Sequence, residues 1–197
     1  MSTDIIIAQL IGTLGCGIAA GGIGTLSLIC IPGLTLPARS SSPGHSNSLP
    51  ETPIPHLAHQ WLDSYDRGNK IFPGICTISS FANGYLAWAL KDVPAPGIIC
   101  GSWTSLYIAA VALNMGIVVF TLLVMKGTND RLRDIAERND AAKDKEVALS
   151  DREKAQRAEE EKQVPVLLQK WTGLNICRAA FPFAGAVVSF YGSVWLK

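Results

Sequence analysis

Residues 98–125 read IICGSWTSLYIAAVALNMGIVVFTLLVM and contain no charged side chain. A helix needs about 20 apolar residues to cross the hydrocarbon core of a bilayer, so this stretch predicts a transmembrane helix. Three further stretches of the same character lie at about residues 5–31, 71–90 and 174–196. The sequence therefore predicts an all-α protein, an antiparallel four-helix transmembrane bundle in which residues 1–197 form one integral membrane domain.

Charged residues are concentrated between the third and fourth spans. The chain has 17 Lys or Arg and 16 Asp or Glu, and 22 of these lie at residues 126–170. Within this stretch Ser150 and Glu153 fit a capping box, which predicts a helix from about Asp151 to Gln163 that ends before Pro165. We interpret residues 126–170 as a charged helical extramembrane insertion. The net charge of +1 argues against a nucleic-acid partner, which requires a basic face.

The distribution of basic residues predicts the orientation of the bundle. Four spans place both termini on one side and the two long loops on the other. The long loops carry 14 Lys or Arg, against Lys91 and Lys197 on the side of the termini. Because basic loops remain in the cytosol, both long loops are predicted to be cytosolic. We expect a multi-pass protein of the endoplasmic reticulum or another endomembrane, with the lipid bilayer as a partner.

The first span is rich in glycine. Six glycines lie between residues 12 and 24. Among them, Gly17 and Gly21 form a GxxxG pair, which permits close approach of helices in lipid. We therefore interpret this pair as a feature of helix packing and not of function.

Three polar segments reach the cytosolic face in this topology. They are His56–Gly68 before the second span, Thr128–Arg131 after the third and Trp171–Arg178 at the start of the fourth. Their convergence, from distant parts of the chain, predicts a functional site at this face.

An arginine lies inside the fourth span. Trp171, Asn175 and Arg178 are spaced i, i+4 and i+7, so they share one helix face. Arg178 sits about one turn inside the span, where an unpaired guanidinium is energetically costly. It therefore needs a partner, and the candidates are Asp130, Asp66 or a ligand.

A purely structural interpretation of the same residues is open. Arg178 can extend its charged head to the interface, and Trp171 can anchor the helix among the lipid headgroups. Asn129 and Asp130 can cap helix ends. Under this interpretation the chain is a non-enzymatic tetraspan scaffold or a small-molecule carrier.

The polar segments resemble the motifs of a known membrane-protein family. TNDRL at residues 128–132, WTGLNICRAA at 171–180 and WLDSYDRG at 61–68 are similar to motifs of the family that includes the fungal anthrone oxygenases. In that family an NDxL motif follows the third helix and a W-x3-N-x2-R motif opens the fourth. The resemblance covers the four-span layout, whereas the charged insertion is longer than the family leads us to expect.

The resemblance implies oxidation of an anthrone-type polycyclic aromatic polyketide to the anthraquinone, with molecular oxygen as co-substrate and no further cofactor. An anthrone has an acidic C–H between two aromatic rings, and its enolate can reduce oxygen directly. A protein then has to supply a pocket, a base and donors that stabilise the enolate oxygen. The residues implied for these roles are Asp130 or His59 as the base, Arg178 and Asn175 as enolate stabilisers, and Trp61, Tyr65, Asn129 and Trp171 as substrate-binding residues.

A metal-dependent oxygenase is a further alternative. His56 and His59 are spaced i, i+3 and could bind a metal together with Glu51 or His45. No motif supplies a third ligand, whereas a catalytic zinc site has three protein ligands. We therefore predict no metal, and we leave open whether the chain forms a homo-oligomer.

Overall fold

The computed structural model describes residues 2–35, 54–95, 97, 101–145 and 150–196. Every element in these ranges is helical, which confirms the predicted all-α class. The elements are α1 (Thr3–Thr25), the π-helical turn η1 (Leu26–Cys30), α2 (Ile31–Leu34), α3 (Ile54–Ala89), α4 (Trp103–Phe120), the π-helical turn η2 (Thr121–Met125), α5 (Lys126–Lys145), α6 (Asp151–Glu161) and α7 (Val164–Trp195).

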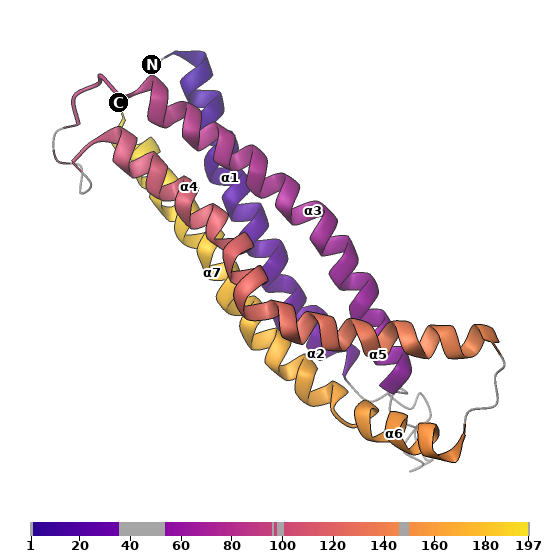
Figure 1. Cartoon of the computed structure of the whole chain (residues 1–197). Helices are drawn as coiled ribbons and strands as arrows, with labels where there is room; N and C mark the ends of the chain where they lie inside the picture. Colours follow the sequence, from indigo (N-terminus) through magenta and orange to yellow (C-terminus); the bar gives the residue numbers. More distant parts are fainter. Residues whose placement is uncertain (1, 36–53, 96, 98–100, 146–149, 197) are drawn as a thin grey trace, which may run out of the picture.

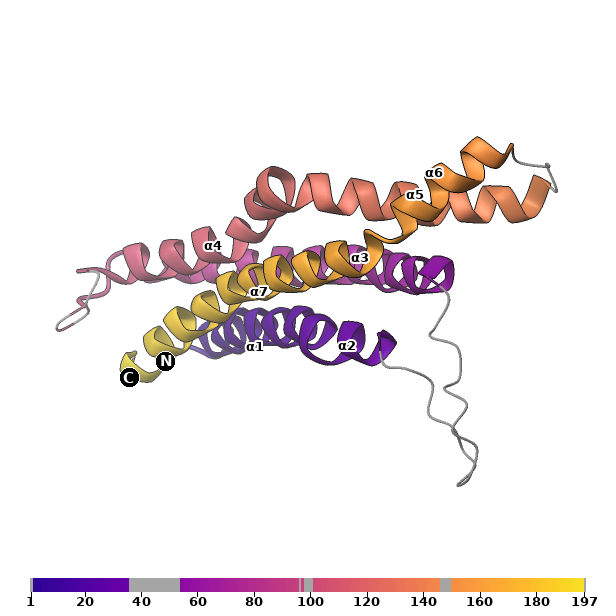
Figure 2. The same ribbon diagram turned by 90° about the horizontal axis from the view of Figure 1, so that it is seen from below.

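Four long helices form an antiparallel bundle (Figure 1). Helices α1 and α4 each pack against both α3 and α7. Both chain termini lie at one end of the bundle, which we call the terminal end. Helices α5 and α6 extend from the other end, which we call the hairpin end (Figures 1 and 2). This arrangement confirms the predicted four-helix layout.

The outer surface of the bundle is apolar. Helix α3 carries several small and polar residues in its second half and falls below the hydropathy that marks a membrane span. Its side chains Phe81 and Trp88 nevertheless face outward, 76% and 65% exposed. Outward-facing apolar side chains of this size are typical of helices in a bilayer. Three continuous helical stretches are long and apolar enough to cross a membrane, namely Thr3–Leu34, Trp103–Arg138 and Asp151–Trp195.

Two helices begin well before the spans predicted for them. Helix α3 runs unbroken from Ile54 through Pro73, so the polar segment before the second span and the span itself form one helix. Helix α7 begins at Val164 rather than near residue 174, with Pro165 in its first turn, where the missing N–H is not needed. Hydropathy marks the edge of the membrane and not the end of a helix, so the spans predicted at residues 71–90 and 174–196 are the apolar parts of two longer helices.

The charged insertion forms the two helices α5 and α6. The predicted capping box is present, since Ser150 Oγ accepts from the Glu153 N–H at 3.4 Å and Glu153 Oε2 accepts from the Ser150 N–H at 2.9 Å. Arg138 of α5 forms an ion pair with Glu160 of α6 at 2.6 Å. Helix α6 contributes no buried residue and is solvated, as predicted. The first half of α5 differs from the prediction, because Leu132, Ile135 and Ala136 are buried against the bundle.

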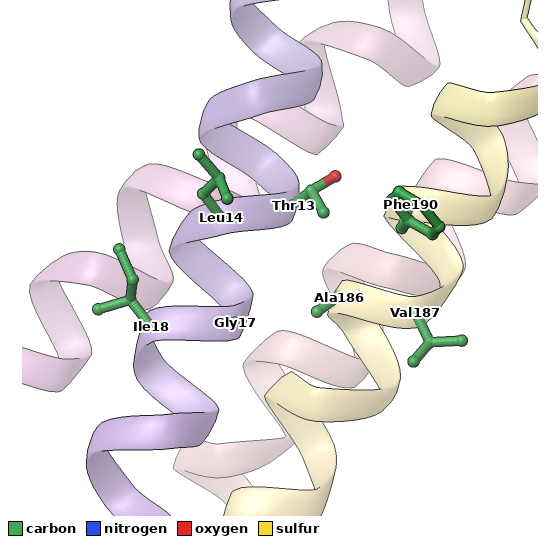
Figure 3. Close-up of a pocket in the computed structure, with 7 residues that line it drawn as sticks. All are labelled: Thr13, Leu14, Gly17, Ile18, Ala186, Val187 and Phe190. Carbon is green, nitrogen blue, oxygen red and sulfur yellow. The ribbon is translucent and has the colours of Figure 1, made fainter.

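The glycines of α1 divide between two faces. A Cβ on Gly12 would lie 2.8 Å from Asn83 Oδ1, and a Cβ on Gly15 would overlap Ser79 Oγ, both on α3. A Cβ on Gly17 or Gly21 would meet nothing within 4 Å. Figure 3 shows Gly17 at the open groove between α1 and α7. The close approach that the GxxxG pair permits is therefore not used between the described helices of this chain.

Substitution of Gly15 tests the close packing of α1 against α3. Gly15→Ala is expected to lower the free energy of unfolding by about 1–3 kcal/mol, the usual effect of overpacking. The added methyl group would displace Ser79, whose hydroxyl donates to the Ile75 carbonyl at 2.8 Å. Gly17→Ala is the matched control and should retain the wild-type stability. Thermal unfolding of both variants in one detergent makes the comparison, and equal stabilities would contradict the close packing.

Candidate functional site

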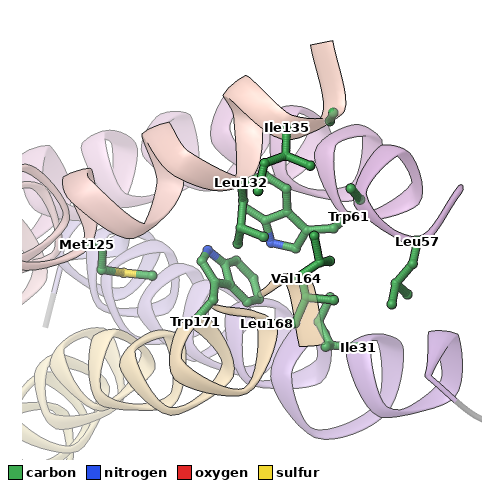
Figure 4. Close-up of a cluster of buried hydrophobic side chains, with 11 residues drawn as sticks. Ile31, Leu57, Trp61, Met125, Leu132, Ile135, Val164, Leu168 and Trp171 are labelled. Carbon is green, nitrogen blue, oxygen red and sulfur yellow. The ribbon is translucent and has the colours of Figure 1, made fainter. Parts of the chain in front are cut away.

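The hairpin end of the bundle contains three aromatic side chains and an asparagine that contact one another. They are Trp61, Tyr65, Trp171 and Asn129, and we call them together the aromatic cluster. Trp61 and Trp171 are 0% and 1% exposed. Their rings meet edge to face with centroids 5.8 Å apart, and Tyr65 stacks on Trp61 at 5.1 Å. Figure 4 shows both tryptophans surrounded by apolar side chains. These side chains belong to Ile31, Leu57, Met125, Leu132, Ile135, Val164 and Leu168.

Asn129 connects two of the aromatic side chains. Its Oδ1 accepts a hydrogen bond from Trp171 Nε1 at 2.9 Å, and its Nδ2 donates to the Tyr65 hydroxyl at 3.4 Å. Tyr65, Asn129 and Trp171 belong to α3, α5 and α7, so these bonds join three helices. The four residues predicted to bind substrate therefore contact one another and form one rigid unit.

Arg133 of α5 lies against the aromatic cluster. Its guanidinium lies 5.6 Å from the centroid of the Tyr65 ring and 2.8 Å from Asp66 Oδ1. Both contacts reach α3 and hold the start of the charged insertion against the bundle. The sequence did not predict a role for Arg133, because one arginine in a run of charged residues carries no local signal.

Asn175 of α7 binds α1 where the helix changes to a π-helical turn. Its Nδ2 donates to the Ile23 carbonyl at 2.9 Å and to Ser27 Oγ at 2.8 Å, whereas its Oδ1 has no partner in the described chain. Asn175 is fully buried, and Ser27 is almost fully buried. Ser27 was not predicted, although a hydroxyl within the apolar run LSLIC was a usable signal.

Arg178 lines a cavity of about 200 Å³, which we call the arginine pocket. Only 8% of Arg178 is exposed. Its Nη1 donates to Thr121 Oγ1 at 3.5 Å, and its Nε has no partner in the described chain. A buried donor without an acceptor is costly, so this N–H is available to an ordered water or a ligand that accepts a hydrogen bond. The other residues that line the pocket are Ile23, Gly68, Asn69, Phe72, Pro73, Ile117, Val118, Thr121 and Leu122.

The two carboxylates expected as partners of Arg178 bind other cations. Asp130 forms an ion pair with Lys126 at 2.6 Å, and Asp66 forms one with Arg133 at 2.8 Å. No ion pair to Arg178 occurs among residues whose positions are described. Of the expected partners, a ligand therefore remains.

The predicted site residues fall into two groups. Arg178, Asn175 and the aromatic cluster lie on adjoining turns of α7 and on its neighbours, and they are buried or half-buried. Asp130 and His59 are exposed. No cluster of three His, Cys, Asp or Glu that could hold a metal occurs in the described ranges. His45 and Glu51, the suggested further ligands of such a site, lie outside those ranges.

Comparison with known proteins identifies a family. The family model described as anthrone oxygenase matches residues 61–188. Anthrone oxygenase encC of Aspergillus fumigatus is 30% identical over 135 residues, which are 68% of this chain and 68% of that protein. Noranthrone monooxygenase of Aspergillus flavus is 29% identical over 69% of this chain and 55% of its own length. Anthrone oxygenase dmxR16 of Cryptosporiopsis sp. is 27% identical over 89% of this chain and 79% of its own length. No solved structure matches.

The matched region contains the three segments on which the resemblance was based, at residues 61–68, 128–132 and 171–180. It also contains the aromatic cluster and Arg178. The similar proteins are named as oxygenases, which confirms the prediction of an enzyme and favours it over a scaffold or carrier. The chain belongs to the anthrone oxygenase family.

Proposed function

We propose that this protein oxidises an anthrone-type polycyclic aromatic polyketide to the anthraquinone with molecular oxygen, and that Arg178 stabilises the enolate formed on the way. The observation that supports this proposal is the arginine pocket. Among the described residues that line it, Arg178 is the charged one, and its Nε faces no protein acceptor. The pocket thus offers a buried positive charge to a mainly apolar molecule with an oxygen that becomes negative.

The reaction needs one deprotonation and one molecule of oxygen. Loss of a proton from the central CH₂ of the anthrone gives an enolate, whose negative charge lies mainly on the oxygen of the opposite carbonyl. The former CH₂ carbon reacts with O₂ to form a C–O bond, and return of the proton removed in the first step gives a hydroperoxide at that carbon. Loss of water from the hydroperoxide leaves the second carbonyl. One oxygen atom enters the product and the other leaves as water, and the four electrons come from the substrate.

A fixed guanidinium favours the first step. In a site from which water is excluded, a nearby positive charge stabilises a developing anion far more than it does in water. Arg178 is 8% exposed and has no carboxylate partner in the described chain, so its charge is not already neutralised. It therefore favours ionisation of a bound anthrone.

The aromatic cluster has a supporting role in this proposal. Its residues do not line the arginine pocket. We therefore propose that they support the helices around the pocket and do not form its walls. Tyr65 links the two parts along α3, since it belongs to the cluster and precedes the pocket residue Gly68 by three residues. Asn175, one turn before Arg178, has a buried Oδ1 without a partner in the described chain. We propose that this atom accepts a hydrogen bond from substrate or from ordered water.

Asp130 and His59 were expected to supply the base, and their exposed positions do not favour that role. We expect Asp130→Asn and His59→Gln to retain turnover close to wild type, because neither residue lines the arginine pocket and Asp130 is paired with Lys126. Turnover of each purified variant with an anthrone measures this. A loss of about 10² or more in either variant, the range seen for general bases, would return the base role to that residue.

Purified protein in lipid nanodiscs, incubated with an anthrone under ¹⁸O₂, tests the proposed function. We expect protein-dependent formation of the anthraquinone with one labelled oxygen. Heat-inactivated protein measures spontaneous oxidation. Because the enolate itself reduces oxygen, activity should survive dialysis against a metal chelator. Absence of product above the spontaneous rate would overturn the proposal, and loss with chelator that returns with a metal would overturn its cofactor-free form.

Two expectations remain predictions from the sequence. They are the cytosolic position of the long loops and a location in the endoplasmic reticulum or another endomembrane, and the question of homo-oligomers stays open. The apolar helices support a membrane protein. An apolar aromatic substrate suits this setting, because it partitions from water into the bilayer.

A further inference from the structure

We propose that the substrate reaches Arg178 sideways from the hydrocarbon phase of the membrane, through a mouth between α3 and the α4–η2 helix. This inference rests on the proposed function, because it concerns the route to the same pocket. Four observations support it: the exposure of the pocket's rim, the closure of the hairpin end, the irregular backbone of both helices at this level and the chemistry of the substrate.

The arginine pocket has a buried inner end and an exposed rim. At the inner end, Ile23, Ile117 and Arg178 are 1%, 6% and 8% exposed. At the rim, Val118 and Leu122 are 45% and 60% exposed and belong to the apolar outer surface of the third span. The cavity therefore leads from Arg178 to the surface that faces lipid.

The opposite route, from the hairpin end, is closed by the aromatic cluster. Trp171 precedes Arg178 by seven residues on α7, or about 10 Å toward the hairpin end. Trp61, Leu132 and Leu168 pack around it and are at most 1% exposed. Figure 4 shows this packing between α3, α5 and α7. A three-ring molecule cannot pass through it without separating these helices.

Both helices that border the mouth depart from regular α-helical bonding there. Pro73 inside α3 has no N–H to donate to the carbonyl of Asn69, one turn earlier. Across the mouth, the π-helical turn η2 begins at Thr121. Asn69, Pro73 and Thr121 all line the pocket. Proline within a helix and π-helical turns are common where helices bend or form functional sites, so these irregularities coincide with the opening.

The chemistry of the reactants fits this route. A polycyclic aromatic molecule is concentrated in the bilayer relative to water, and molecular oxygen is likewise apolar. A side entrance brings both to Arg178 without exposing the guanidinium to bulk water. The charge then acts on the enolate in a medium of low dielectric constant.

Tryptophan substitutions at neighbouring positions test the route. Val118→Trp and Leu122→Trp place a bulky ring at the mouth, whereas Val119→Trp and Leu123→Trp place it on the same helix away from the pocket. Val119 and Leu123 are 58% and 79% exposed, so the control positions are more exposed to lipid than the mouth positions. We expect the mouth variants to lose roughly tenfold to a hundredfold in kcat/KM, with a smaller loss in kcat. The controls should match the wild type.

A labelling experiment gives a readout that does not depend on turnover. Leu122→Cys and Leu123→Cys are treated in membranes with a lipid-soluble maleimide, and modification at each position is measured by peptide mass spectrometry. Added anthraquinone should slow labelling at position 122 and leave position 123 unchanged. Thermal unfolding checks that all variants are folded.

The outcomes separate the route from the function. Equal kcat/KM within each tryptophan pair, or equal labelling with and without anthraquinone, would overturn the side entrance while leaving the proposed function intact. A wild-type protein that does not convert an anthrone would overturn the proposed function, whatever the labelling shows.

Discussion

Arg178→Ala is expected to lower turnover per folded protein by roughly 10² or more, the usual loss when a preorganised charge-stabilising donor is removed. Arg178 is 8% exposed, lines the pocket and has an Nε without a protein acceptor in the described chain. Its field therefore acts on whatever negative charge appears in the pocket. Removing it should raise the barrier to enolate formation, and kcat should fall together with kcat/KM.

The conservative variant refines this expectation. Arg178→Lys should recover only part of the activity, because an ammonium group keeps the charge but lacks the planar arrangement of N–H donors. Its shorter reach also weakens the hydrogen bond to Thr121, which is 3.5 Å long in the wild type. A fully active lysine variant would show that charge alone is sufficient.

Arg67→Ala is a suitable control for Arg178→Ala. Arg67 lies on α3 close to the pocket residue Gly68, but its side chain is 75% exposed and pairs with Asp63 on the same helix. It should retain wild-type turnover. The comparison is made by steady-state kinetics on protein that elutes as a single species in detergent. Wild-type turnover in Arg178→Ala, with reduced thermal stability, would show that Arg178 has a structural role and not a catalytic one.

Trp171→Ala is expected to lower the free energy of unfolding by about 3–5 kcal/mol, the range for removing a fully buried large aromatic side chain. Trp171 is 1% exposed, packs edge to face against Trp61 and donates a hydrogen bond to Asn129. Its loss leaves a cavity where α3, α5 and α7 meet. The variant should also lose activity, because the cluster supports the turn that carries Arg178.

A second variant at Trp171 separates packing from hydrogen bonding, and a variant at an exposed tryptophan serves as the control. Trp171→Phe retains an aromatic ring but leaves Asn129 Oδ1 without its donor, which should lower stability by about 1–3 kcal/mol. Trp88→Ala removes an outward-facing tryptophan that is 65% exposed and should have little effect. Thermal and denaturant-induced unfolding in one detergent provide the measurement. Equal stabilities for Trp171→Ala and Trp88→Ala would contradict the central position of Trp171.

Much of the fold could be predicted from local pattern. The apolar run at residues 98–125 indicated a span because a helix satisfies its own backbone hydrogen bonds and needs no identified neighbour in lipid. The capping box at Ser150 and Glu153 was equally local and is present. The starts of α3 and α7 could not be predicted from hydropathy, since both helices extend far beyond the apolar residues that mark the membrane.

The candidate site was predicted in part. Trp171, Asn175 and Arg178 share a face because of their spacing, and that face is buried in the structure. The sequence alone could not show which carboxylate would approach Arg178. Asp130 pairs with Lys126 one turn away, and Asp66 pairs with Arg133, 67 residues distant. Such choices depend on the direction of each side chain once the helices have packed.

The sequence by itself determined the membrane helices, the charged hairpin and the helix face that carries Arg178, because each depends on residues within a few turns of one another. The tertiary structure alone decided that Thr121 would meet Arg178, that Ser27 would meet Asn175 and that a cavity would open between α3 and α4. These contacts join residues 57 and 148 positions apart. They arise from the crossing and rotation of whole helices, which no short stretch of sequence encodes.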